Sequence, residues 1–114
     1  MKLTNLSKKN VVIENVIEAK SFWSRFVGLM GKKSLDPKSS LWLLPCNNIH
    51  TFFCRFAMDV IFVDRSLVVQ AVYENLGPRH VIWYVHKAHS AFEMNSGIIK
   101  AMNVQKGDQL HVGH

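Results

Sequence analysis

The sequence has few cysteines, no long apolar run and no cluster of charge, and each lack argues against a class of protein. Two cysteines in 114 residues are too few for a disulfide scaffold, and a reducing compartment would keep both as thiols. No segment approaches the roughly 18 consecutive apolar residues of a membrane span. The opening residues, MKLTNLSKKN, have no apolar stretch behind their lysines, so they do not resemble a secretory signal. We therefore expect a cytoplasmic protein without a membrane partner.

Acidic residues are also scarce, since 8 Asp and Glu accompany 14 Lys and Arg and give a formal net charge of +6. Such a balance can indicate binding to nucleic acid. The basic residues, however, cluster only as the pairs at 8–9 and 32–33. The others are scattered, and no run of five or more occurs. The three tryptophans form no stacking series with Lys or Arg. We expect nucleic-acid binding to be weak and non-specific at most.

The chain does have enough apolar material for one hydrophobic core. It is 48% hydrophobic and 19% charged, which is ordinary for a globular protein, and its length fits one domain. No repeat, low-complexity tract or linker divides it. We expect a single domain over 1–114, with the core at about 11–112 and a flexible N-terminal segment at 1–9.

Short β-type segments separated by turn residues dominate the chain. Ser21 can cap a helix that ends at Met30, because its apolar residues recur at helical spacing and Gly31 suits the stop. Turns are expected at Asp64-Arg65-Ser66 and Asn95-Ser96-Gly97, and a single helical turn is expected at 98–103. About seven strands are expected, at 11–17, 41–44, 49–63 with a bend near Ala57, 67–73, 81–85, 90–95 and 109–112. This pattern predicts a mostly β fold, a compact antiparallel β-sandwich or distorted barrel with one short helix, because no βα alternation indicates a parallel sheet.

The segment CNNIHTFFC places Cys46, His50 and Cys54 at a regular spacing of four. In a strand, residues four apart are separated by roughly 13 Å, whereas zinc ligands must meet within about 2.3 Å of one ion. The same separation opposes a disulfide, whose Cα atoms lie within about 7 Å. We therefore predict two thiols, no metal site and no cofactor.

Alternation along 50–62 predicts two different faces. The even positions run from His50 to Phe62 and are apolar apart from His50, so Cys54 is predicted to lie in the core. The odd positions carry Thr51, Arg55 and Asp59 among apolar neighbours. A carboxylate next to a buried strand needs partners, and the sequence leaves open whether Asp59 belongs to a structural ion pair or to a functional pocket.

Several motifs occur in a fixed order along nearly the whole chain: GLM at 28–30, IHTFFCRFAMDVIFVD at 49–64, AFEMNSG at 91–97 and KGDQL at 106–110. Together they resemble the domain of unknown function 192 family, whose central pattern is similar to HTFGMRFPIDVVFLD. The chain departs from that pattern at Phe53, Cys54 and Ala57, which replace glycine, methionine and proline. Cysteine in place of methionine exchanges one hydrophobic residue for another and supports a core position for Cys54. The resemblance implies a compact, mostly antiparallel β fold with a short helix carrying GLM, and it implies no activity.

Three functions remain open from the sequence. The first is a small binding domain that takes a small ligand or a partner segment at a polar patch. The second is an enzyme of hydrolase or lyase type that uses His50 as general acid or base beside a carboxylate. The third is the weak nucleic-acid binder. The predicted binding patch consists of His50, Thr51, Arg55, Asp59 and Glu93.

Overall fold

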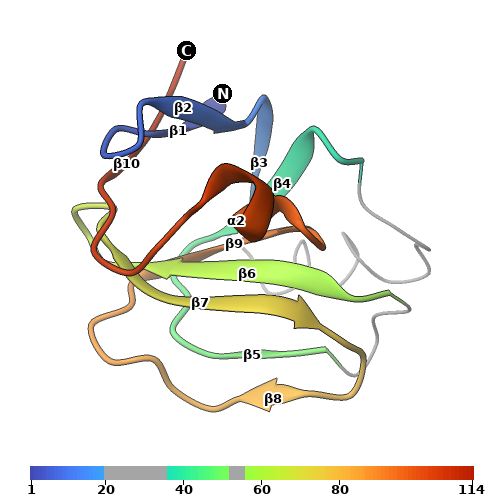
Figure 1. The fold of residues 1–114 in the computed structure, drawn as a ribbon. Coiled ribbons are helices and arrows are strands. Elements are labelled where there is room, and N and C mark those ends of the chain that lie inside the picture. The colour runs from blue at the N-terminus through green and yellow to red at the C-terminus, as the bar shows by residue number, and fades with distance from the viewer. Residues whose placement is uncertain (20–35, 52–55) are drawn as a thin grey trace.

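The computed structural model describes residues 1–19, 36–51 and 56–114. Strands dominate the described residues, and a short helix lies near the C-terminus (Figure 1). The elements are β1 (Lys2–Asn5), β2 (Asn10–Ile13), β3 (Asn15–Ala19), β4 (Ser39–Leu43), β5 (Ile49–His50), β6 (Met58–Val63), β7 (Val69–Leu76), β8 (Val81–Ile82), β9 (Ser90–Asn95), α2 (Ile98–Met102) and β10 (Leu110–Gly113). The predicted mostly β fold is confirmed. The predicted helix at 21–30, with its GLM motif, lies outside the described residues.

The main sheet has five strands in the order β3-β4-β9-β6-β7. Its pairs are antiparallel except that β3 lies parallel to β4, a pairing that the sequence did not predict. A three-stranded sheet, β10-β1-β2, and a two-stranded ribbon, β5-β8, complete the described strands. The main sheet is open, with β3 and β7 at its edges. Among the described residues the fold is therefore a sandwich and not a closed barrel.

Two apolar clusters lie on opposite faces of the main sheet. One includes Val60 and Phe62 of β6 and reaches Ile49 and Val85, so it extends to the β5-β8 ribbon. The other includes Ile61 and residues of the small sheet and α2. In Figure 1, α2 and the small sheet accordingly lie on one side of β6 and β7, and the ribbon lies on the other. All six residues of β6 are buried, because both faces of this strand are covered.

Two predicted segments need correction. The expected strand 49–63 comprises two strands, because β5 pairs with β8 whereas β6 lies between β7 and β9. Residues 1–9 contribute to the packing, since β1 pairs with both β10 and β2 and Leu3 is fully buried. The core therefore extends toward the N-terminus beyond the predicted limit at residue 11. No helix among the described residues has the length and apolar character to cross a membrane.

Candidate functional site

The residues of the predicted patch take different positions in the fold. Asp59 is fully buried, and its carboxylate accepts three backbone N–H groups. The Oδ1 atom accepts from Asn75 at 2.8 Å, and Oδ2 accepts from Gly97 at 3.0 Å and from Ile99 at 2.9 Å. Asn75 lies where the register between β6 and β7 shifts, and it has a left-handed backbone with φ 53°. The Asp59 carboxylate therefore joins an irregularity of β7 to the start of α2.

Thr51 is also fully buried and fully engaged. Its hydroxyl donates to the Gly77 carbonyl at 2.7 Å and accepts the His80 N–H at 2.8 Å. Its backbone N–H donates to the His80 carbonyl at 2.9 Å, and its carbonyl accepts from Arg79 at 3.1 Å. These bonds attach the end of β5 to the turn before β8.

Asp59 and Glu93 lie on opposite faces of the main sheet. Directly opposed residues of antiparallel strands point to the same face, and neighbours along a strand point to opposite faces. Asp59 is opposite Met94, and Val60 is opposite Glu93. Glu93 therefore shares its face with Val60, and Asp59 shares its face with Met94. Arg55 and the His50 side chain lie outside the described parts of the structure, so the five-residue patch stays a prediction, although Asp59 and Glu93 cannot share one face of it.

A cleft with a cavity of about 360 Å³ lies elsewhere, at the loop that follows β4. Its described lining consists of Pro45, Cys46, Asn47, Asn48, Arg65, Ala88 and His89. None of these side chains carries a carboxylate, whereas one guanidinium, two carboxamides and one imidazole are present. A cleft of this size and composition suits a small ligand with several hydrogen-bonding oxygens.

Backbone hydrogen bonds fix the walls of this cleft. The Cys46 N–H donates to the His89 carbonyl at 2.7 Å, and the Val85 N–H donates to the Asn47 carbonyl at 2.8 Å. The His89 N–H in turn donates to Val63 at the end of β6, at 2.8 Å. The 45–48 loop and the 85–89 segment are thereby held together and attached to the main sheet.

Arg65 reaches the cleft from the turn between β6 and β7. Asp64 organises this turn, because its Oδ1 accepts the N–H groups of Ser66 and Val68, both at 2.9 Å. Its Oδ2 accepts from the Gln70 amide at 3.2 Å. Arg65 is exposed, and neither an ion pair nor a hydrogen bond engages its guanidinium among the described residues. The guanidinium is therefore available to an oxyanion.

Cys46 is buried and belongs to the lining of the cleft. Its Sγ donates to the Asn48 carbonyl at 2.9 Å. A reactive cysteine needs an accessible thiolate, whereas this thiol is buried and uses its proton in a hydrogen bond. The geometry thus assigns Cys46 a packing role. Cys54, predicted to lie in the core, falls outside the described residues.

The sequence did not predict the cleft. No spacing along the chain relates residues 45–48 to 65 or to 88–89. The pairing of β6 with β9 and the bonds from 85–89 bring them together.

Comparison with known proteins places the chain in a family. Residues 3–112 match the domain of unknown function 192 (DUF192, Uncharacterized ACR), and the chain belongs to this family, as its motifs suggested. A UPF0127 protein of Thermococcus sibiricus (strain DSM 12597 / MM 739) is 30% identical over 115 residues, which cover 95% of this chain and 72% of that protein.

Two crystal structures have the same fold. A protein of unknown function from Novosphingobium aromaticivorans DSM 12444 superposes with a TM-score of 0.81 and 19% identity, over 97% of this chain and 82% of that one. A protein of Sinorhizobium meliloti 1021, described as a putative transcription regulator, superposes with a TM-score of 0.76 and 20% identity, over 96% of this chain and 89% of that one. At such identities the likeness concerns the fold alone.

Proposed function

We propose that this member of the domain of unknown function 192 family is a binding protein for small oxyanions, namely metabolites that carry a carboxylate or phosphate group. The observation that supports the proposal is the cleft of about 360 Å³, whose described lining offers Arg65, Asn47, Asn48 and His89 and contributes no carboxylate. Arg65 would hold the anionic group through paired N–H donors, and the carboxamides would bind neighbouring oxygens.

The electrostatics of the surroundings favour the same class of ligand. The chain carries a net charge of +6, which raises the local concentration of anions. The nearest acidic side chain in the sequence, Asp64, is engaged by two backbone N–H groups and by Gln70. It therefore holds the turn that carries Arg65 and does not pair with Arg65 itself.

Thermal-shift screening of a library of small carboxylates and phosphates tests the proposal, because a ligand that binds the native state raises the Tm by mass action. We expect at least one compound to stabilise the protein and its affinity to fall roughly tenfold or more in Arg65→Ala, since a charge-assisted hydrogen bond is lost. Arg65→Lys keeps the charge without the planar fork and should retain part of the affinity. Lys100→Ala, which removes an exposed cation of α2, is the matched control.

Two results would contradict this function. One is the lack of any stabilising compound in the library. The other is a compound that stabilises the protein but binds Arg65→Ala as tightly as the unmodified chain.

We further propose a cytoplasmic location and a single domain over 1–114. The low cysteine content, two in 114 residues, supports the location, because small secreted domains are commonly held by several disulfides. The pairing of β1 with β10, which joins the two ends of the chain in one sheet, supports the single domain.

A further inference from the structure

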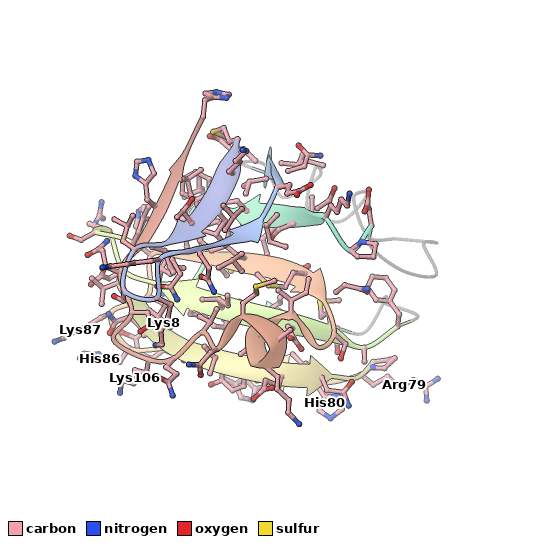
Figure 2. All side chains as sticks on the ribbon, turned by 45° about the horizontal axis from the view of Figure 1, so that its top comes forward. Lys8, Arg79, His80, His86, Lys87 and Lys106 are labelled. Carbon is pink, nitrogen blue, oxygen red and sulfur yellow. The ribbon has the colours of Figure 1, made fainter. Side chains whose placement is uncertain are left out.

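The segment that contains β8 carries exposed aromatic rings between two pairs of basic residues, each an Arg or Lys beside a His. Trp83 is 83% exposed and Tyr84 is 61% exposed, which is unusual for rings of this size. Figure 2 shows Arg79 and His80 at one end of the molecule and His86 and Lys87 at the opposite end. We call these six residues, Arg79, His80, Trp83, Tyr84, His86 and Lys87, the 79–87 strip.

The strip contains no acidic residue, and neither do the other positions from 77 to 92. Arg79 and Lys87 are exposed, and no ion pair engages either of them within the described residues. The Tyr84 and His86 rings meet edge to face, with centroids 6.4 Å apart, so neighbouring parts of the strip support each other. A partner that covers these rings would therefore gain by being acidic.

The backbone of this segment offers a second feature. Among the described strands, β8 pairs only with β5, so one edge of β8 carries no strand, and Figure 1 shows β8 on the outside of the molecule. The bonds from Arg79, His80 and Val85 to residues 47–51 all belong to the β5 side. A strand with one unpaired edge exposes N–H and C=O groups that a further strand can engage.

We propose that the 79–87 strip binds an extended, acidic segment of a partner protein, which adds as a strand along β8. Backbone hydrogen bonds would align the segment, Trp83 and Tyr84 would pack against its side chains, and Arg79 and Lys87 would attract its carboxylates. The unpaired edge distinguishes this partner from others. A membrane interior would leave the backbone groups of that edge unsatisfied, and nucleic-acid bases would stack on the rings without using them.

The probe is a fluorescently labelled decapeptide of alternating glutamate and valine, with its binding measured by anisotropy at low salt. We expect weak binding that decreases as the salt concentration rises, because charge attraction contributes to it. Trp83→Ala should weaken binding roughly tenfold or more, as for an aromatic residue at the centre of an interface. Leu6→Ala removes an apolar side chain that is 51% exposed in another region, and it should leave binding unchanged.

Variants that remove the charges of the strip can be compared with a control variant at a position of the same backbone conformation. Arg79 and Lys87 have left-handed backbones, with φ 63° and 65°, so asparagine is the appropriate neutral replacement. Arg79→Asn combined with Lys87→Asn should weaken binding and reduce its salt dependence. Lys9 is also exposed and left-handed, with φ 58°, so Lys9→Asn is the control and should bind as the unmodified protein does.

A peptide N-methylated at every residue tests the backbone. It keeps the charges but has no backbone N–H to donate along either edge, so it should bind much more weakly. The proposal would be overturned by equal binding of the methylated peptide, by unchanged binding in Trp83→Ala, or by no binding up to about 1 mM peptide. Tighter binding of a ten-nucleotide oligo-dT or of anionic lipid vesicles, lost in Trp83→Ala, would also overturn it and would assign the strip to that other partner.

Discussion

Asp59 of β6 and Ile99 of α2 are joined by a buried hydrogen bond, in which Asp59 Oδ2 accepts the Ile99 N–H at 2.9 Å. The same carboxylate accepts the N–H groups of Gly97 and Asn75. One side chain thus stabilises the start of a helix and an irregular position of the neighbouring strand. This arrangement explains how the Asp59 carboxylate can be fully buried in a mostly apolar sheet.

Replacement of Asp59 should therefore destabilise the protein severely. Asp59→Asn removes the charge and brings an amide toward backbone donors, which should lower the free energy of unfolding by about 3 kcal/mol. Chemical denaturation measures the change. Glu74→Gln, at an exposed position of β7, is the control and should be close to neutral. A loss below about 0.5 kcal/mol for Asp59→Asn would show that its three hydrogen bonds are not important for stability.

Thr51 provides a second test of a buried polar contact. Thr51→Val keeps the shape but leaves the His80 N–H without its acceptor, so unfolding free energy should fall by about 1–3 kcal/mol. Thr51→Ser retains the hydroxyl and should cost less. Hydrogen exchange should also accelerate at residues 79–82 in Thr51→Val. Equal stability of the valine and serine variants would refute this role of the hydroxyl.

Asp108 should make stability depend on pH in the acid range. Burial raises the pKa of Asp108, but hydrogen bonds from Lys8, Asn5 and the Gln105 N–H, together with the Lys8 charge, outweigh burial and lower the pKa below its ordinary value. The ionised Asp108 carboxylate therefore makes its full contribution to the free energy of unfolding above the unfolded-state pKa of about 3.9. This contribution is lost as pH falls through the lower native pKa. Denaturation at a series of pH values should show a smaller acid-induced loss for Asp108→Asn than for the unmodified protein. Parallel curves for the two proteins would contradict the assignment.

Phe62 tests the apolar cluster that faces the ribbon. Its side chain is fully buried and meets the Tyr73 ring edge to face, with centroids 5.9 Å apart. Phe62→Ala should lower the free energy of unfolding by roughly 3–5 kcal/mol, which is a large part of the total stability of a small domain. Trp83→Ala removes a larger but exposed ring and should leave the free energy of unfolding almost unchanged. Comparable losses for the two variants in urea denaturation would be incompatible with this core.

The two cysteines are predicted to be thiols without bound zinc. Thiol titration of fresh, denatured protein without reductant should count two. In the native protein Cys46 should react slowly, because it is buried. Elemental analysis should find no stoichiometric zinc. A count of zero, or one zinc per chain that is lost in Cys46→Ala, would disprove the prediction.

Local patterns in the sequence determined several elements of this protein. SAFEMN forms β9 at the predicted residues 90–95, and the Asp64-Arg65-Ser66 turn lies where it was expected. Gly97, with φ 98°, lies in the turn between β9 and α2, as the turn residues indicated. In each case the controlling interactions lie within a few residues, namely a side chain that accepts nearby N–H groups or a backbone conformation that glycine favours.

Only the tertiary structure decided which strands meet and therefore which polar groups share a site. Alternation along 50–62 resembled one strand, but an alternation of period two does not specify the partner strand. In the structure β5 pairs with β8, whereas β6 pairs with β7 and β9. The register of β6 against β9 places Asp59 and Glu93 on opposite faces. The cleft likewise unites residues 45–48, 65 and 88–89 through backbone bonds between segments far apart in the chain. Such contacts depend on the packing of whole sheets, so no local spacing in the sequence could reveal them.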